Sequence, residues 1–171
     1  IFPSFMPDLV INATGCTFDA NKSLTAGAGA VEIQNGNCNS ATDPEKVNIV
    51  FTDCSFIDNE SVKSTGGAVE IRTNSCAKFD GITATGNKAA HNGGAIYVTS
   101  NYSRVYITGD VTASGNAGNG GADSTFIHLY NSNYSNPPRI YTTYGEDAPW
   151  YTTALIGGNR SSITFNMTTL P

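Results

Sequence analysis

Apolar and polar residues alternate with a period of two in short runs, and these runs recur along the chain. In one run Cys16 and Phe18 flank the polar Thr17, and the same positions of a later run hold Cys54 and Phe56. Such alternation is typical of a β-strand with one buried face. An amphipathic helix would need a period of about 3.6 residues, and stretches of that kind are nearly absent. The pattern therefore predicts an all-β protein.

Each run belongs to a longer repeating unit that contains a glycine turn and a second apolar run, as in Gly66-Gly67-Ala68-Val69-Glu70-Ile71. A third short run precedes the first one in every unit. A period of about 20 to 50 residues is the signature of a solenoid. The glycine before each alanine recurs at 38, 27 and 27 residues, at Gly29, Gly67, Gly94 and Gly121.

Equivalent strands lie one full unit apart, so we expect each strand to pair with its counterpart in the next unit. A parallel β-helix of about four to five coils, with three short strands per coil, has this arrangement, and its coils lie about 4.8 Å apart. The coils are expected over residues 1–130, with a surface loop at about 36–45. Residues 131–171 are expected to form a loop excursion and a partial last coil or cap. We expect one domain that is a segment of a longer protein.

An asparagine follows the first run of every unit. If the coils stack, these side chains meet at one corner, where each amide can donate a hydrogen bond to the carbonyl oxygen of the next. The expected ladder residues are Asn21, Asn59, Asn87 and Asn116.

The four cysteines follow the same spacing, because Cys16 and Cys54 are 38 residues apart, as are Cys38 and Cys76. An even number of cysteines in a chain of extracellular composition favours disulfides. Their positions predict two bonds between adjacent coils, Cys16–Cys54 and Cys38–Cys76. The alternative is four buried free thiols. No Cys-x-x-Cys occurs and no histidine lies near a cysteine in the sequence, so neither a metal nor another cofactor is expected.

Seven Asn-x-Ser/Thr sequons occur, which suits a secreted glycoprotein. Two of them, at Asn21 and Asn59, coincide with the ladder and are expected to stay unmodified. The remaining five lie in loops or at an outward strand position and are the expected glycan acceptors: Asn12, Asn101, Asn133, Asn159 and Asn166.

Catalytic and nucleic-acid-binding patterns are weak. The net charge of −5 argues against a nucleic-acid partner, and no apolar run reaches the roughly 20 residues that span a bilayer. Both histidines stand alone in the sequence, and His91 is most simply a solvated turn residue. The acidic residues near turns lie at different offsets in their units: Asp53, Asp58, Asp80 and Asp110. We therefore predict that the protein is not an enzyme.

The repeated pair of motifs resembles the repeats of the polymorphic outer-membrane protein (Pmp) family. Here the pair reads Phe56-Ile57-Asp58-Asn59 with Gly66-Gly67-Ala68-Val69, and its second half recurs as Gly93-Gly94-Ala95-Ile96. The likeness covers about residues 9 to 130, and the third and fourth copies have Ala where the family has Phe. The resemblance implies a right-handed parallel β-helix that is exposed at a cell surface and used in adhesion.

The expected function is that of a non-catalytic extracellular β-helix module, structural or adhesive, in a cell-surface or filament glycoprotein. Its expected partners are other subunits or further coils of a longer chain, with cell-surface glycans as a further class. The alternative is a polysaccharide lyase or glycoside hydrolase that acts on acidic polysaccharides. A threonine-rich ice-binding face is a third alternative, but the outward positions include Glu32, Glu70 and Tyr97 instead of regular threonine rows.

Overall fold

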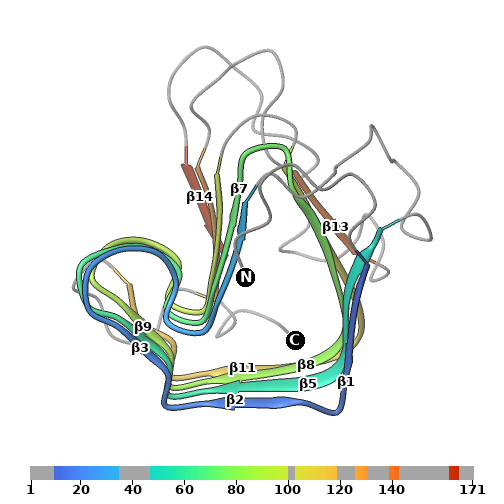
Figure 1. Cartoon of the computed structure of the whole chain (residues 1–171), viewed down its shortest axis with the longest axis horizontal. Coiled ribbons are helices and arrows are strands. Elements are labelled where there is room, and N and C mark those ends of the chain that lie inside the picture. The colour runs from blue at the N-terminus through green and yellow to red at the C-terminus, as the bar shows by residue number, and fades with distance from the viewer. Residues whose placement is uncertain are drawn as a thin grey trace.

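The computed structural model describes residues 10–34, 47–99, 103–118, 126–130, 139–142 and 162–165. These residues form three β-sheets and no helix, so the prediction of an all-β protein is confirmed. In particular, no helix among them is long and apolar enough to cross a membrane. Figure 1 shows that strands of successive repeats lie directly over one another.

The six-stranded sheet has the order β1-β5-β8-β11-β13, and β2 also pairs with β5. Its strands are β1 (Ile11–Thr14), β2 (Thr17–Asp19), β5 (Ile49–Ile57), β8 (Cys76–Thr85), β11 (Arg104–Ser114) and β13 (Arg139–Thr142). The five-stranded sheet has the order β14-β12-β10-β7-β4. Its strands are β4 (Val31–Gln34), β7 (Val69–Arg72), β10 (Ile96–Thr99), β12 (Ile127–Tyr130) and β14 (Ser162–Phe165). The three-stranded sheet contains β3 (Lys22–Ser23), β6 (Glu60–Ser61) and β9 (Lys88–Ala89).

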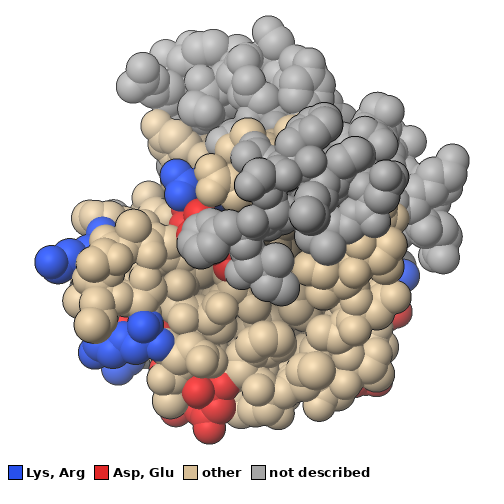
Figure 2. All heavy atoms as spheres, in the orientation of Figure 1, with Lys and Arg blue, Asp and Glu red and all other residues tan. Residues whose placement is uncertain are grey.

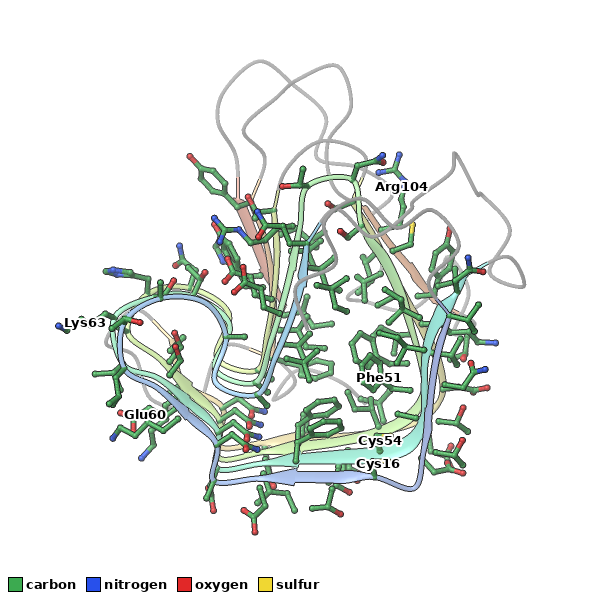
Figure 3. The ribbon with its side chains drawn as sticks, viewed as in Figure 1. Cys16, Phe51, Cys54, Glu60, Lys63 and Arg104 are labelled. Atoms are coloured by element: carbon green, nitrogen blue, oxygen red, sulfur yellow. The ribbon has the colours of Figure 1, made fainter. Side chains whose placement is uncertain are left out.

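Strands from consecutive repeats pair in parallel, and the register keeps equivalent residues side by side. Phe18 pairs with Phe56, which in turn pairs with Ala84, as the alternation predicts. The rings of Phe18 and Phe56 stack with centroids 4.8 Å apart. A second stack joins Phe51 to Phe79 at 5.1 Å in the core between the sheets (Figure 3). Because like residues stack on like, the repeat in the sequence becomes a continuous apolar core.

Two of the three strands predicted per repeat are joined into one bent strand in β5, β8 and β11. The bends fall at Asp53, Gly81 and Gly109, whose φ angles are 51°, 71° and 65°. A left-handed residue changes the direction of the strand without ending it, and glycine and aspartate tolerate that conformation best. The separate strands expected from the sequence therefore become two arms of a single strand.

The four ladder asparagines form the hydrogen-bonded column expected from the sequence. Asn59 donates from Nδ2 to Oδ1 of Asn87 at 2.9 Å, and Asn87 donates in the same way to Asn116 at 2.8 Å. Asn21 donates to Oδ1 of Asn59 at 2.9 Å. Asn59 and Asn87 are fully buried, whereas Asn21 is exposed. Amides that stack in this way satisfy one another inside the protein.

The predicted Cys16–Cys54 disulfide is wrong for this structure, because both thiols are free. The two residues occupy equivalent positions of adjacent parallel strands, with the Ser55 amide donating to the Cys16 carbonyl oxygen (Figure 3). In-register parallel side chains point the same way at a spacing of about 4.8 Å, whereas a disulfide needs Cβ atoms about 3.5–4.5 Å apart. Cys76 is disulfide-bonded, and its predicted partner, Cys38, lies outside the described residues.

Several other sequence-based expectations also fall outside the described residues, namely the loop at 36–45 and the sequons at Asn101, Asn133, Asn159 and Asn166. The remaining acceptor, Asn12, is exposed in β1. The expected loop excursion after residue 130 contains a strand that the sequence did not predict, β13, which pairs in parallel with β11. Farther along the chain, β14 pairs with β12 in the antiparallel sense.

Candidate functional site

The outward face of the five-stranded sheet carries a row of four polar or aromatic side chains, which we call the floor row. Strand register places Glu32 beside Glu70, Glu70 beside Tyr97, and Tyr97 beside His128. Period-two alternation explains this placement, because the neighbours of each residue along its strand point into the core. Three of the four side chains are nonetheless buried, with exposed fractions of 3% for Glu70, 8% for Tyr97 and 4% for His128.

A turn of the chain lies against the floor row and contributes to this burial. The chain between β6 and β7 curves outward and then returns beside β7, and the later repeat follows the same course (Figure 1). Glycines with positive φ, Gly66 and Gly93, bring the turn close to the sheet. A Cβ atom on Gly93 would lie 2.8 Å from Cβ of Tyr97, and one on Gly66 would lie 3.2 Å from Cβ of Glu70. The close approach therefore requires glycine.

The two carboxylates share one arginine. Arg72 Nη1 lies 3.2 Å from Oε1 of Glu32, and Arg72 Nε lies 3.6 Å from Oε1 of Glu70. The hydroxyl of Thr65 also donates to Oε1 of Glu70 at 2.9 Å. Glu70 Oε2 is buried and has no hydrogen-bond partner among the described residues. Desolvation raises the pKa of Glu70, the Thr65 hydrogen bond and the Arg72 charge oppose that rise, and the charge of Glu32 adds to it.

Stacked rings continue the floor row toward β12. The ring of Tyr97 stacks on that of His128, with centroids 5.6 Å apart and planes 16° from parallel. It also stacks on Tyr130 at 6.4 Å and 23°. Burial raises the pKa of Tyr97 to about 12 and lowers that of His128 to about 4. Both rings are therefore uncharged at neutral pH.

A second outward row lies two residues farther along each strand, and we call it the rim row. All of its side chains are partly exposed, and all carry hydrogen-bonding groups. Its members are Gln34, Arg72, Thr99 and Tyr130, which the register places on neighbouring strands. The floor and rim rows together bring an amide, a guanidinium, hydroxyl groups, carboxylates and aromatic rings onto one face of the sheet.

The sequence reveals only part of this site. It correctly predicts that Glu32, Glu70 and Tyr97 point outward, but it does not predict that they are covered. His128 stands alone in the sequence, and the sequence does not predict that it occupies the floor row beside Tyr97. His91 is exposed in its turn, as expected. Perturbed pKa values cluster at functional sites, and three of the four described groups with a resolved shift lie in the floor row.

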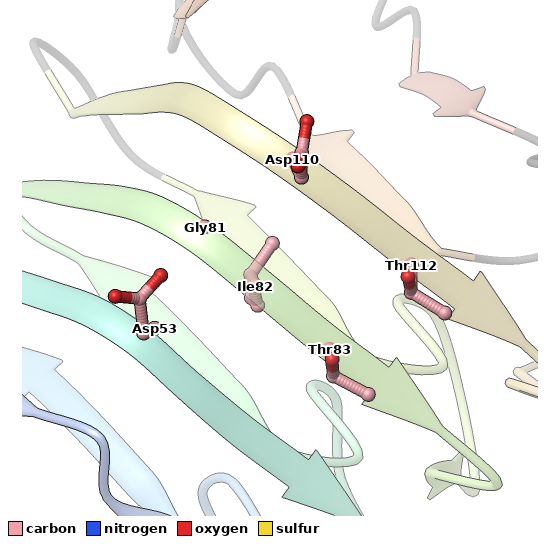
Figure 4. A pocket seen from close by; sticks show the side chains of 6 residues that line it. All are labelled: Asp53, Gly81, Ile82, Thr83, Asp110 and Thr112. Carbon is pink, nitrogen blue, oxygen red and sulfur yellow. The ribbon is translucent and has the colours of Figure 1, made fainter.

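A separate open pocket of about 200 Å³ lies outside the bend of the six-stranded sheet. Asp53 and Asp110 flank Gly81 there (Figure 4), so two of the aspartates that the sequence places at different offsets line the same pocket. A bulge in β11 after Thr108 brings Asp110 to this position. No group of three or more potential metal ligands occurs among the described residues. Two solvent-exposed carboxylates without a further ligand make a weak case for a metal or catalytic site.

A group of basic residues lies away from the floor row and from the Asp53 pocket. Figure 2 shows several Lys and Arg side chains toward the left of the molecule, and Figure 3 places Lys63 on the turn that follows β6. On the three-stranded sheet Lys22 forms an ion pair with Glu60 at 2.6 Å. Both side chains of this pair are well exposed, with 51% and 39% of their surface accessible, so solvent weakens the interaction.

The face that carries the floor and rim rows is therefore the best-built candidate site among the described residues. It can accept and donate hydrogen bonds and can stack against a flat ligand surface. Comparison of the chain with known family models, curated proteins and solved structures gives no match.

Proposed function

We propose that the chain is a non-catalytic extracellular module with a structural or adhesive role at a cell surface or in a filament. We further propose that it folds as a right-handed parallel β-helix, a solenoid of about four to five coils. The single observation that carries the proposal is the register, which keeps equivalent residues of successive repeats side by side in all three sheets. Such stacking produces long, regular outward faces, which repeat proteins use as extended binding surfaces.

The interior supports a scaffold role. The core is a column of stacked apolar residues, and the asparagine ladder joins the repeats by hydrogen bonds between side chains. Each repeat contacts mainly its neighbours, so further repeats or another subunit could extend the same stack. We propose these as partners, together with cell-surface glycans.

An adhesion assay tests this function. Purified protein immobilised on beads would be presented to cells and to extracellular matrix, and retention would be compared with that of beads carrying an unrelated β-rich protein. We expect specific retention that the soluble protein competes away. In parallel, incubation with pectin-like and other uronate polymers should release no products. Sustained turnover of such a polymer would contradict a non-catalytic role, and absence of retention on every surface would remove the adhesive one.

One observation favours a second candidate function, a glycoside hydrolase that acts on acidic polysaccharides. Glu32 and Glu70 are in register on adjacent strands, so their backbones are about 4.8 Å apart. Retaining glycosidases hold their two carboxyl groups about 5–5.5 Å apart and raise the pKa of one of them. Burial raises the pKa of Glu70, as a general acid requires. If this candidate is correct, Glu70→Gln should abolish polymer cleavage.

A further inference from the structure

We propose that the outward face of β4, β7, β10 and β12 is a binding site for an uncharged oligosaccharide. The inference rests on the proposed adhesive function and gives that function a ligand class. In this arrangement the rim row contacts the sugar directly, while the adjacent floor row supplies the stacked ring of Tyr97 and a buried hydrogen-bond acceptor.

The chemistry of the rim row is the first argument. Every member offers a hydrogen-bonding group, and every member is partly exposed. Arg72 presents several N–H donors to a ligand, since 40% of its side chain is accessible. Tyr130 adds a flat ring at the end of the row that continues the stack from Tyr97. Hydrogen-bonding groups placed beside an aromatic surface suit a ligand with hydroxyl groups around its edge and C–H groups on its faces.

The charge of the site disfavours an acidic oligosaccharide. Arg72 is shared by two carboxylates, Glu32 and Glu70, so it has no positive charge to spare for a ligand. An anionic ligand would meet these carboxylates, and a cationic ligand would compete with Arg72 for them. An anionic ligand finds no unshared cation on this face among the described residues. A polyhydroxyl ligand needs none.

The unpartnered oxygen of Glu70 is the second, independent argument. Glu70 is 3% exposed, and its Oε2 has no partner among the described residues. A buried acceptor without a donor costs about 1–3 kcal/mol. A ligand hydroxyl that donates to Oε2 would recover this energy, and Thr65 and Arg72 would keep their contacts with Oε1. The free protein therefore contains an acceptor that a donor-rich ligand can satisfy.

The geometry of the sheet determines the direction of the ligand. The rim residues lie on successive strands, about 4.8 Å apart, so the row runs across the strands and along the direction in which the repeats stack. One hexose unit of a linear oligosaccharide has a length similar to this spacing. Consecutive sugar units can therefore contact consecutive strands. A peptide added by strand pairing would instead bind at a sheet edge, not on this face.

The test is an array of neutral oligosaccharides (linear chains of glucose, galactose, mannose and xylose) with sulfated and uronate chains as comparison, followed by calorimetric titration of each positive. Two site variants, Arg72→Gln and Tyr130→Ala, would be matched with two variants outside the site. Lys63→Gln removes one exposed cation, and Leu24→Ala removes an exposed apolar side chain. Thermal unfolding would establish that all four variants are folded.

We expect the wild-type protein to bind at least one neutral chain and each site variant to bind it at least about tenfold more weakly, a loss of about 1.4 kcal/mol. The two control variants should bind as the wild type does. The proposal is overturned if no neutral chain binds, if only anionic chains bind, or if the site variants bind normally. If cell adhesion survives in both site variants, the adhesive function stands but does not depend on this face.

Discussion

Asn87 is fully buried and stands in the middle of the ladder. Its Nδ2 donates to the Phe56 carbonyl oxygen at 2.9 Å and to Asn116, while its Oδ1 accepts from Asn59. Replacing it with alanine would leave donors and acceptors unpaired on both sides. We expect Asn87→Ala to lower the free energy of unfolding by about 3 kcal/mol, measured by urea denaturation.

Asn21 provides the matched control for that substitution. It lies at one end of the described ladder and is exposed, and among the described residues it donates only to Asn59. Asn21→Ala should therefore cost less than about 1 kcal/mol, because water can replace the lost hydrogen bonds. Equal losses for the two variants would show that the ladder does not stabilise the interior.

His128 should make the stability of the protein depend on pH. Its pKa is lowered to about 4 in the folded protein from an ordinary value of 6.5. Between these values the unfolded chain binds a proton that the folded chain does not, so stability falls as pH drops from about 6.5 to about 4. The loss is on the order of 3 kcal/mol. Urea denaturation at several pH values would measure it.

The variant His128→Gln carries no titrating ring and should have a flatter profile in the same pH window. The raised pKa of Glu70 acts in the opposite direction, because its folded form keeps a proton that the unfolded form loses as pH rises. Glu70→Gln should therefore steepen the loss of stability at acid pH. If His128→Gln and the wild type give the same profile, the imidazole is charged or solvated in the folded protein.

At the scale of strands and turns, Gly67 of the Gly-Gly-Ala motif shows how closely the repeats approach one another. A Cβ atom on Gly67 would lie 1.9 Å from the carbonyl oxygen of Gly94 and 2.6 Å from the amide nitrogen of Lys88. Both are backbone atoms of the next repeat, which paired strands hold in place. We expect Gly67→Ala to lower the free energy of unfolding by about 3 kcal/mol or more, measured by thermal or urea unfolding.

Gly15 offers a comparison that separates crowding from backbone conformation. Its φ is +61°, but a Cβ atom there would meet no described residue within 4 Å. Gly15→Ala should lower the free energy of unfolding by about 1–2 kcal/mol, because only the left-handed conformation of alanine is unfavourable there. Gly67 is not among the glycines with positive φ. A loss for Gly67→Ala no larger than that for Gly15→Ala would therefore show that the contact between repeats does not require glycine at position 67.

The strand register was predictable because every repeat preserves the alternation within each run. The bends were not, because a single left-handed residue such as Asp53 changes strand direction while each arm keeps its own alternation. The candidate site was also only half predictable. Alternation gives the outward direction of Glu70, but its burial depends on a turn that folds back on the sheet. Sequence periodicity carries no information about such a cover.

At the scale of the whole molecule, the sequons test both the fold and the extracellular proposal. Asn12 is exposed on β1, whereas Asn59 is fully buried in the ladder. An oligosaccharyltransferase needs an accessible side-chain amide, and the amide of Asn59 donates to the Phe18 carbonyl oxygen and to Asn87. A protein made in a eukaryotic secretory pathway should therefore carry a glycan at Asn12 and none at Asn59.

Asn21 makes this prediction sharper, because it is exposed although its amide belongs to the ladder. If folding precedes modification, Asn21 should stay unmodified in the wild type, since its Nδ2 is held by Asn59. Removing that acceptor with Asn59→Ala should then allow some modification at Asn21. Peptide mapping by mass spectrometry, with Asn12→Gln as the control that removes the expected glycan, measures all three positions. A glycan at Asn59 in folded, secreted protein cannot coexist with the buried ladder, and it would refute the stacking of the repeats on which the proposed adhesive surface depends.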